Sequence, residues 1–255
     1  MAAKSCADAR SRVRLSADFL LSRVVGAFPR PYRDRLREVR FRNNVRICYR
    51  LNKGDLHSIR EVWFEEAYRL PFDEPSGALL DLGANIGMTS VWLWRRCRFT
   101  QAVAVEPDPR NAAVLRRNLE LNGVNARVVE AAIGSYQGVA RFELNQASNL
   151  GSVSESSAGK NSAEVPMTTV NALMKELGIE RWGLAKIDIE GGEAALLKDQ
   201  TEWLDRTGAI IIELHPQHVD CDEMARAITA HHFKHIPSNS VFAGNMDSFV
   251  RLQNT

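Results

Sequence analysis

The sequence predicts an α/β fold with a mostly parallel sheet covered by helices. Short apolar runs alternate along the chain with segments of helical periodicity, and several of these runs end in an acid; such alternation is typical of parallel sheets. The first unit starts at the apolar run 78–80, passes through a glycine turn and a helical segment over 88–97, and ends with the run 102–105 and Glu106. A βαβ unit closed by an acid is typical of sites that bind a nucleoside.

Charge divides the chain into two parts. Residues 1–50 carry 13 Lys/Arg against 4 Asp/Glu, whereas the remaining residues carry 20 against 27. We therefore expect a basic, mainly helical N-terminal extension over 1–50 and the α/β domain over 51–255. With 255 residues, 45% of them hydrophobic, the chain can bury a full core. The four cysteines are widely spaced and form no paired motif, which predicts reduced thiols in a cytoplasmic protein.

The basic extension contains one segment of helical periodicity, over 11–25, before Pro29 and Pro31. Its apolar residues are expected on one side of an amphipathic helix: Val13, Phe19, Leu20 and Val24. No apolar run is long enough for a membrane span or an export signal. Arginines can contact nucleic-acid phosphates, but no aromatic residues interleave them here, so we favour a helical cap over the active site or a homodimer face.

The glycine turn discriminates between nucleoside cofactors. A dinucleotide-binding loop, counted from Gly83, needs glycines at positions 85 and 88, where this chain has Asn85 and Met88. This disfavours a nicotinamide dehydrogenase. The spacing Asp-x-Gly-x-Asn-x-Gly resembles the first motif of class I S-adenosylmethionine (SAM) methyltransferases, whose loop receives a methionine moiety. Glu106 follows Gly87 by 19 residues and can accept hydrogen bonds from ribose hydroxyls.

The segments around this unit complete the pattern. Alternating residues over 45–51 predict a hairpin-like lead-in, followed by a helix through 59–64. A helix capped by Asp108 is expected to run to residue 121, with a third strand over 127–129 and an adenine-binding turn at 130–134. A short strand follows over 138–144, and an irregular loop, either a linker or a substrate lid, over 145–164. Thr168 or Thr169 then caps a helix that ends at Gly178.

A second group of polar residues follows two later apolar runs. Leu184–Gly192 contains Asp188 and Glu190, and Ala209–Pro216 contains Glu213 and His215. Residues two apart on a strand share a face, so each pair is expected to point the same way. Ligands of open α/β sheets bind beyond the carboxyl ends of the strands. We therefore expect all four side chains in one cleft, although Glu190 could instead cap the next helix.

Taken together, five segments resemble the FkbM family of SAM-dependent methyltransferases. They are DLGANIG, VEPDPRNAAVLRRNLELN, AAIGSYQG, LAKIDIEGGE and IIIELHPQ, in this order. The resemblance covers roughly residues 55–233. It implies a class I Rossmann-like fold with a seven-stranded, mostly parallel sheet and a reversed C-terminal hairpin over 235–252. It also implies O-methylation of a hydroxyl on a small molecule, such as a sugar, a polyketide or another secondary metabolite.

The resemblance also assigns residues to the site. The methionine side of SAM is assigned to Asp81, Gly83, Asn85 and Gly87, with Ser90 and Tyr68 as neighbours. Glu106 is assigned to the ribose, and Glu130 with Ala131 to the adenine. The substrate side, which includes the catalytic base, is assigned to Asp188, Glu190, Glu213 and His215.

Two chemical routes and two other functions stay open. His215 could act as a base near neutral pH, or Asp188 and Glu213 could bind Mg²⁺. We prefer the metal-free route because no Asp-Asp pair stands at either strand end. An RNA ribose 2′-O-methyltransferase would use the basic extension together with Lys186, Asp188 and Glu213. A non-catalytic SAM-binding module would keep the loops without transferring a methyl group.

Overall fold

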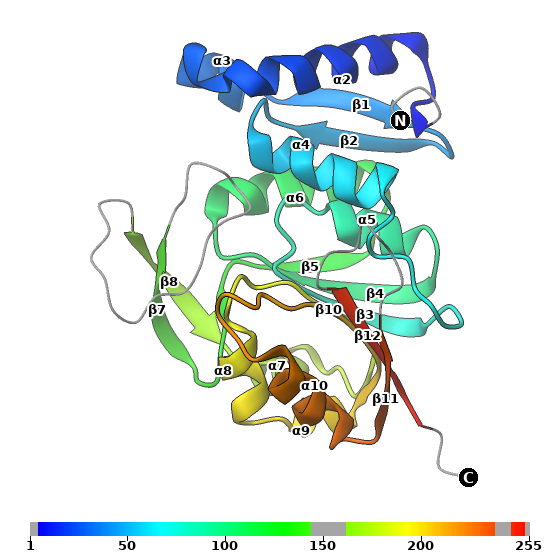
Figure 1. Ribbon diagram of the computed structural model, residues 1–255, viewed down its shortest axis with the longest axis vertical. Helices are drawn as coiled ribbons and strands as arrows, with labels where there is room; N and C mark the ends of the chain where they lie inside the picture. Colours follow the sequence, from blue (N-terminus) through cyan, green and yellow to red (C-terminus); the bar gives the residue numbers. More distant parts are fainter. Residues whose placement is uncertain (1–4, 144–161, 238–245, 253–255) are drawn as a thin grey trace.

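A seven-stranded sheet forms the centre of the protein (Figure 1). The structure, a computed structural model, describes residues 5–143, 162–237 and 246–252. The strand order is β11-β12-β10-β9-β3-β4-β5, where the strands are β3 Ser76–Leu82, β4 Arg98–Val105, β5 Ala126–Val129, β9 Trp182–Ile187, β10 Thr207–Glu213, β11 Phe233–Pro237 and β12 Met246–Arg251. Only β12 runs against its neighbours. The predicted reversed C-terminal hairpin is therefore confirmed; its connection, 238–245, lies outside the described residues.

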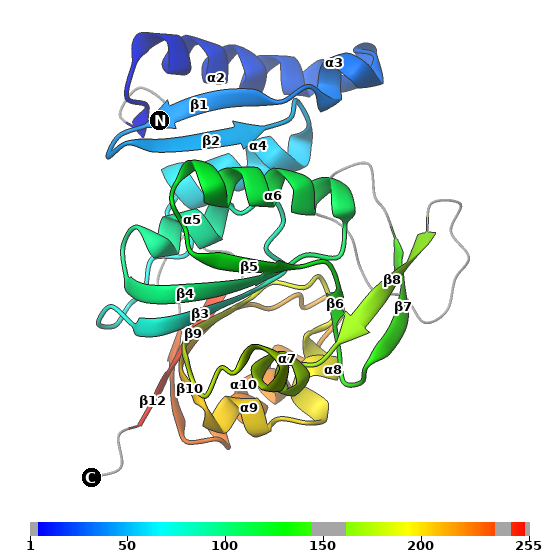
Figure 2. The same ribbon diagram turned by 180° about the vertical axis from the view of Figure 1, so that it is seen from behind.

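Helices cover both faces of this sheet, as Figures 1 and 2 show. One face carries α5 Met88–Trp94 and α6 Pro109–Leu121. The other carries α7 Val170–Leu177, α8 Glu193–Lys198, α9 Glu202–Asp205 and α10 Cys221–Thr229. Because alternate strand residues point to opposite faces, Leu79 packs in one hydrophobic core and Leu80 in the other. Strands buried on both faces explain the continuous apolar runs in the sequence.

The predicted helix ends are found at the expected capping residues. The side chain of Asp108 accepts a hydrogen bond from the backbone N–H of Arg110 at the start of α6, with Pro109 in the first helical position. Thr169 caps α7 through the backbone N–H of Ala172, and Gly178 ends this helix with a left-handed φ of 64°. Each cap satisfies a terminal backbone group that the helix itself leaves unpaired.

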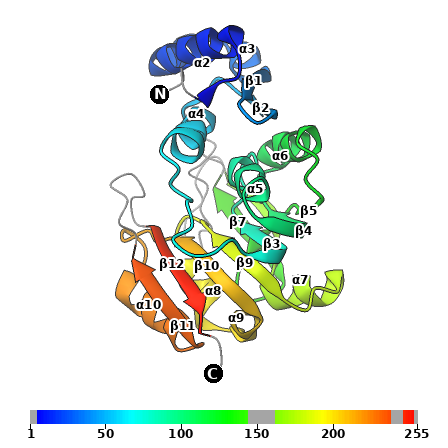
Figure 3. The same ribbon diagram turned by 90° about the vertical axis from the view of Figure 1, so that its right-hand side faces the viewer.

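The N-terminal segments form a separate layer outside α5 and α6 (Figure 3). This layer comprises α2 Ala9–Leu21, η1 Ser22–Ala27, α3 Arg30–Asp34, β1 Arg37–Phe41, β2 Val45–Tyr49, α4 Lys53–Ile59 and the π-helical turn η2 Arg60–Phe64. Antiparallel pairing of β1 with β2 makes the predicted lead-in one half of a hairpin. The basic extension, residues 1–50, thus supplies a two-stranded hairpin as well as helices.

The predicted apolar side of the first helix is wrong for three of its four residues, whereas the fourth, Phe19, is half-buried and packs against the core. Val13, Leu20 and Val24 are 71%, 61% and 56% exposed, respectively. The buried side of α2 instead carries Leu15 between two polar residues, Ser11 and Asp18. Polar groups can be buried when hydrogen bonds satisfy them, and a pattern of apolar residues alone does not reveal such partners.

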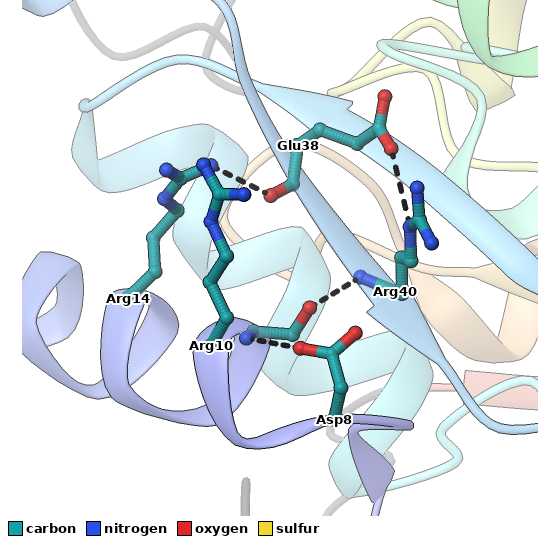
Figure 4. A pocket seen from close by; sticks show the side chains of 6 residues that line it. Asp8, Arg10, Arg14, Glu38 and Arg40 are labelled. Atoms are coloured by element: carbon teal, nitrogen blue, oxygen red, sulfur yellow. Dashed lines mark hydrogen bonds and ion pairs between the residues drawn. The ribbon is translucent and has the colours of Figure 1, made fainter.

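Hydrogen bonds from α2 to β1 show how this burial is satisfied (Figure 4). The Oγ of Ser11 accepts from the backbone N–H of Arg40 at 3.0 Å, and the guanidinium of Arg14 donates to the carbonyl of Glu38 at 3.3 Å. Asp18 accepts at 2.7 Å from the hydroxyl of Tyr49 in β2. These contacts fix the outward direction of the apolar residues on the opposite side of α2.

A small second sheet lies beside the main one. It consists of β6 Ala132–Ile133, β7 Gly138–Glu143 and β8 Ser162–Thr168, in the order β6-β8-β7. The prediction of an irregular loop over 145–164 is wrong for residues 162–164, which pair with β7; residues 145–161 lie outside the described part. Among the described helices, none is long and apolar enough to cross a membrane.

Candidate functional site

The turn after β3 has a backbone that only small or special residues adopt easily. Gly83 and Gly87 have φ of 72° and 83°, and Asn85 has φ of 49°. A Cβ on Gly83 would lie 1.8 Å from the backbone oxygen of Asp188. The glycine turn and the start of the acidic segment after β9 are therefore in direct contact, and no side chain fits between them.

A buried charged network supports this turn from below. Asp81 is fully buried at the end of β3, where it accepts a 2.5 Å hydrogen bond from the Oγ of Ser90. The ammonium of Lys186 lies 3.2 Å from Asp81 and donates to the carbonyl of Gly83 at 2.8 Å. Burial lowers the pKa of Lys186, but the charges of Asp81 and Asp188 outweigh it, and the pKa is raised. Lys186 is therefore a permanent cation in the site.

Asp81 and Ser90 are both completely buried and bonded to each other. In this structure they support the turn from below, and their place on the methionine side of the cofactor stays a prediction. Tyr68 is also buried; its hydroxyl donates to the carboxylate of Asp188 at 3.2 Å, which places Tyr68 beside the acids as well as near the turn.

Glu106 lies where the sequence places it, just after β4. One carboxylate oxygen accepts from the backbone N–H of Asn85 and the other from that of Asp108, both at 2.9 Å. Burial raises the pKa of Glu106 to about 7. Each carboxylate oxygen can accept a further hydrogen bond, and the side-chain oxygen of Asn85 is buried without a partner among the described residues. Polar groups of this kind suit a ribose.

The turn after β5 is less enclosed. Glu130 is exposed and forms a 2.5 Å ion pair with Arg116, whereas Ala131 is buried. An adenine contact from this pair stays a prediction.

Beyond the ends of β9 and β10, three side chains converge. One ligand-type atom from each of Asp188, Glu213 and His215 lies within 4.8 Å of the others. Asp188 also lies 3.5 Å from the ammonium of Lys186. The carboxyl ends of adjacent parallel strands meet at one edge of the sheet, which brings residues 25 or more positions apart into contact.

The physical reason given for this convergence is wrong in one respect. β9 ends at Ile187 and β10 at Glu213, so neither predicted pair lies on a strand and the two-residue alternation does not orient them. Glu190 sits in a turn with a positive φ of 49° and reaches to within 3.5 Å of the Nε2 of His215. It makes no side-chain cap to α8.

His215 is held by an acid that sequence reasoning missed. Its Nδ1 lies 2.6 Å from the Oε1 of Glu193, which is completely buried in the first turn of α8. Burial lowers the pKa of His215, but the hydrogen bond and the charge of Glu193 outweigh it and raise this pKa to about 9. A carboxylate on Nδ1 fixes the tautomer and turns Nε2 toward the cleft.

Burial and mutual repulsion raise the proton affinity of the other acids. The pKa of Glu213 is raised to about 8, and that of Glu190 to about 7, by burial and then by the charge of Asp188. Glu61, which sequence reasoning also missed, lies in η2 and has its pKa raised to about 7 by the same two causes. Strongly perturbed acids in one cluster are typical of functional sites.

A family comparison identifies the fold that carries this site. The model of the methyltransferase FkbM domain matches residues 81–235. This chain belongs to the FkbM methyltransferase family. All the residues described above except Glu61 and Tyr68 fall inside the matched FkbM domain, so the turn, the acids and His215 are parts of one family domain.

Individual relatives agree with this membership. The FkbM-family chain is 25% identical over 190 residues to the methyltransferase sdnD of Sordaria araneosa, covering 61% of this chain and 73% of the relative. It is 25% identical over 247 residues to the 31-O-demethyl-FK506 methyltransferase FkbM of Streptomyces tacrolimicus, covering 83% and 94%. The solved FkbM methyltransferase of Methylobacillus flagellatus is similar in fold, with a TM-score of 0.50 and 16% identity over 74% of this chain; that match spans 47% of the solved chain.

The residues missed from sequence had weak signals. Lys186 lies in an apolar run, and the sequence suggests a role for it only in an RNA methyltransferase. Glu193 follows two glycines and resembles an ordinary acid in the first turn of a helix. Glu61 belongs to a helical turn outside the βαβ units, and only the folded structure brings it near enough to feel the charge of Asp188. The three pairs, Lys186 with Asp81, Glu193 with His215, and Glu61 with Asp188, could not be predicted because their members lie far apart in the sequence.

Proposed function

We propose that this FkbM-family protein transfers the methyl group of SAM to a hydroxyl of a small molecule. The carrying observation is the contact between the glycine turn and the acidic cluster, since a Cβ on Gly83 would collide with the backbone of Asp188. A cofactor in the turn and an acceptor at Asp188, Glu213 and His215 would thus be neighbours. Placing two reactants side by side is the largest demand of a methyl transfer.

The residues present fit SAM. Gly83, Asn85 and Gly87 hold the turn with positive φ, the side-chain oxygen of Asn85 has no partner among the described residues, and Glu106 can take hydroxyls of a ribose. When bound, SAM supplies an electrophilic methyl group.

The protein's own groups would then position and deprotonate the acceptor. The imidazole of His215, oriented by Glu193, presents Nε2 to the cleft and can take a proton once it is neutral. Glu213 is a second candidate, because its raised pKa of about 8 lies close to physiological pH. Asp188 would hold the hydroxyl by a hydrogen bond.

The donor set does not fit Mg²⁺ well. Mg²⁺ prefers oxygen ligands in an octahedron, whereas the cluster offers two carboxylates and an imidazole. Asp188 is already engaged by Tyr68 and by the ammonium of Lys186, and that ammonium would repel a second cation. We therefore propose a metal-free reaction.

Other assignments have less support. For an RNA acceptor, part of the basic charge of the extension is already used, because Arg37, Arg46 and Arg50 are paired with acids of the protein. A homodimer face on α2 stays a proposal.

All four cysteines are free thiols. Reduced cysteines suit the cytoplasm, which we propose as the location of the protein.

Calorimetry and a transfer assay test this function. S-adenosylhomocysteine should bind to the protein more tightly than NAD, and labelled SAM should yield a product one methyl group heavier on a hydroxylated acceptor. In Asp188→Asn and Glu213→Gln, turnover should fall while S-adenosylhomocysteine binding remains. Tight cofactor binding without transfer to any hydroxyl compound would favour the non-catalytic alternative, and retained RNA with salt-dependent affinity would favour the RNA alternative.

A further inference from the structure

We propose that a groove between α2 and α4 binds an apolar body with an anionic group, and that this is the distal part of the methyl acceptor. The second half of this statement rests on the proposed function. The groove has a volume of about 810 Å³, which is within the range of small-molecule sites. Its apolar lining comes from both sides: Phe19 and Leu20 of α2, and Leu56 and Phe64 of the α4–η2 segment.

The apolar lining is partly open to solvent. Leu20 is 61% exposed, and the rings of Phe19 and Phe64 lie 6.0 Å apart, centroid to centroid, without filling the groove. Leu20 and the two rings together form an apolar surface beside the hollow, which suits an apolar ligand. Ser11 and Asp18 lie on the buried side of α2, which leaves Leu20 on the side that faces the groove.

The charged lining has one sign. Arg23, Lys53, His57 and Arg60 line the groove, and no acid lies among the described residues that do so. Arg60 is paired with Glu65 at 3.1 Å, whereas Arg23 and Lys53 have no acidic partner among the described residues. Charge complementarity therefore calls for an anionic group on the ligand, such as a carboxylate or a phosphate.

The α4–η2 segment connects the groove with the candidate active site. His57 lines the groove and is near enough to Asp188 for the carboxylate to oppose the lowering of its pKa by burial and by Arg60. Ser58 accepts a 3.4 Å hydrogen bond from the side chain of Asn85 in the glycine turn. Glu61, in the same segment, is near enough to Asp188 for the charge of that carboxylate to raise its pKa. A ligand in the groove could thus extend one end toward the acids.

Calorimetry with two probes tests the groove without requiring methyl transfer. The probes are 3-hydroxydecanoate and 1,3-decanediol, which share an apolar chain and differ in charge. The hydroxy acid should bind about fivefold or more tightly than the diol, the size expected for one or two exposed ion pairs. Arg23→Glu combined with Lys53→Glu should abolish this preference, and Leu20→Ser should weaken binding of both probes.

The matched control changes the same charges elsewhere. Lys175→Glu combined with Arg181→Glu alters exposed residues on the other side of the sheet and should leave the affinities for both probes unchanged. None of the variants should change the affinity for S-adenosylhomocysteine. No binding of either probe, or a preference that survives the groove variant, overturns the proposal. If the Arg23→Glu, Lys53→Glu variant loses binding to phosphatidylglycerol vesicles but binds both probes as the wild type does, the groove is a membrane-binding surface instead. If the probes bind as expected but no hydroxyl is methylated, the proposed function fails while the groove stands.

Discussion

The Nδ1 of His215 lies 2.6 Å from the Oε1 of Glu193, a completely buried acid 22 residues earlier in the chain. The two residues belong to different elements, since Glu193 begins α8 and His215 follows β10. Their contact raises the pKa of His215 to about 9. A histidine with an unperturbed pKa would be neutral at physiological pH, and this one is largely protonated there.

The first prediction concerns the pH profile of the proposed reaction. A base must be deprotonated, so activity should rise with pH, with a limb near 9 if His215 is the base and near 8 if Glu213 is. Glu193→Gln removes the charge that raises the pKa of His215 and should move a His215 limb to lower pH. Initial rates between pH 5 and 10 measure this, and a limb near 6 in the wild type would contradict the assigned contacts.

The second prediction is that stability falls with rising pH because of the buried acids. The pKa of Glu213 in the folded protein, about 8, lies above its ordinary value of 4.5. The folded state therefore binds this proton more tightly, and its contribution is fully present below pH 4.5 and is lost as pH rises through 8. Glu213→Gln should raise the melting temperature at pH 8.5 but not at pH 4.5. The exposed Glu180→Gln is the control, and equal shifts at both pH values would refute the interpretation.

Lys186 provides a third prediction. Its ammonium is 1% exposed and lies 3.2 Å from Asp81. Removing one partner of a buried pair leaves a charge without compensation, so Lys186→Met should cost about 3–5 kcal/mol of unfolding free energy. Adding Asp81→Asn should recover part of this loss. Urea denaturation measures both; the exposed Lys175→Met serves as control, and a cost as small as that of the control would show that the pair is not coupled.

The close approach at Gly83 gives a fourth prediction. Gly83→Ala must move the backbone of Asp188, because the new Cβ would lie 1.8 Å from its oxygen. We expect lower stability together with loss of S-adenosylhomocysteine binding. Gly178→Ala separates the two effects, since Gly178 has a similar φ of 64° but nothing within 4 Å of an added Cβ. Gly178→Ala should show only the smaller loss of stability that a positive φ causes. If Gly83→Ala still binds S-adenosylhomocysteine, the turn is not part of the cofactor site.

Cofactor contact at Glu106 is the basis of the fifth prediction. Glu106→Ala should weaken S-adenosylhomocysteine by about 1.5–3 kcal/mol, the range for hydrogen bonds to a charged group. Both carboxylate oxygens of Glu106 also accept from the backbone, one from Asn85 and the other from Asp108. Glu106→Gln keeps the volume and one of these two bonds, whereas Glu106→Ala loses both, so Gln is the milder variant. Calorimetry with adenosine as a second ligand checks the location, since adenosine retains the ribose; an unchanged affinity for both would place the ribose elsewhere.

The sequence by itself determined the α/β fold, its family and the segments that form the candidate site. The signals that predict these features are local, because each depends on a few neighbouring residues. They are the apolar runs that end in acids, the glycines at 83 and 87, whose φ is positive, and the caps at Asp108 and Thr169. They predict the sheet, its helices and the family.

Tertiary structure decided which polar groups meet. Glu193 contacts His215, and Glu61 comes within the electrostatic influence of Asp188, across elements far apart in the chain, so no spacing in the sequence reveals these pairs. The outward side of α2 was decided in the same way, since the hairpin supplies the partners that allow Ser11 and Asp18 to be buried. Apolar periodicity records the preference of each side chain for water or core, but the burial of a polar group depends on a partner that only packing brings near.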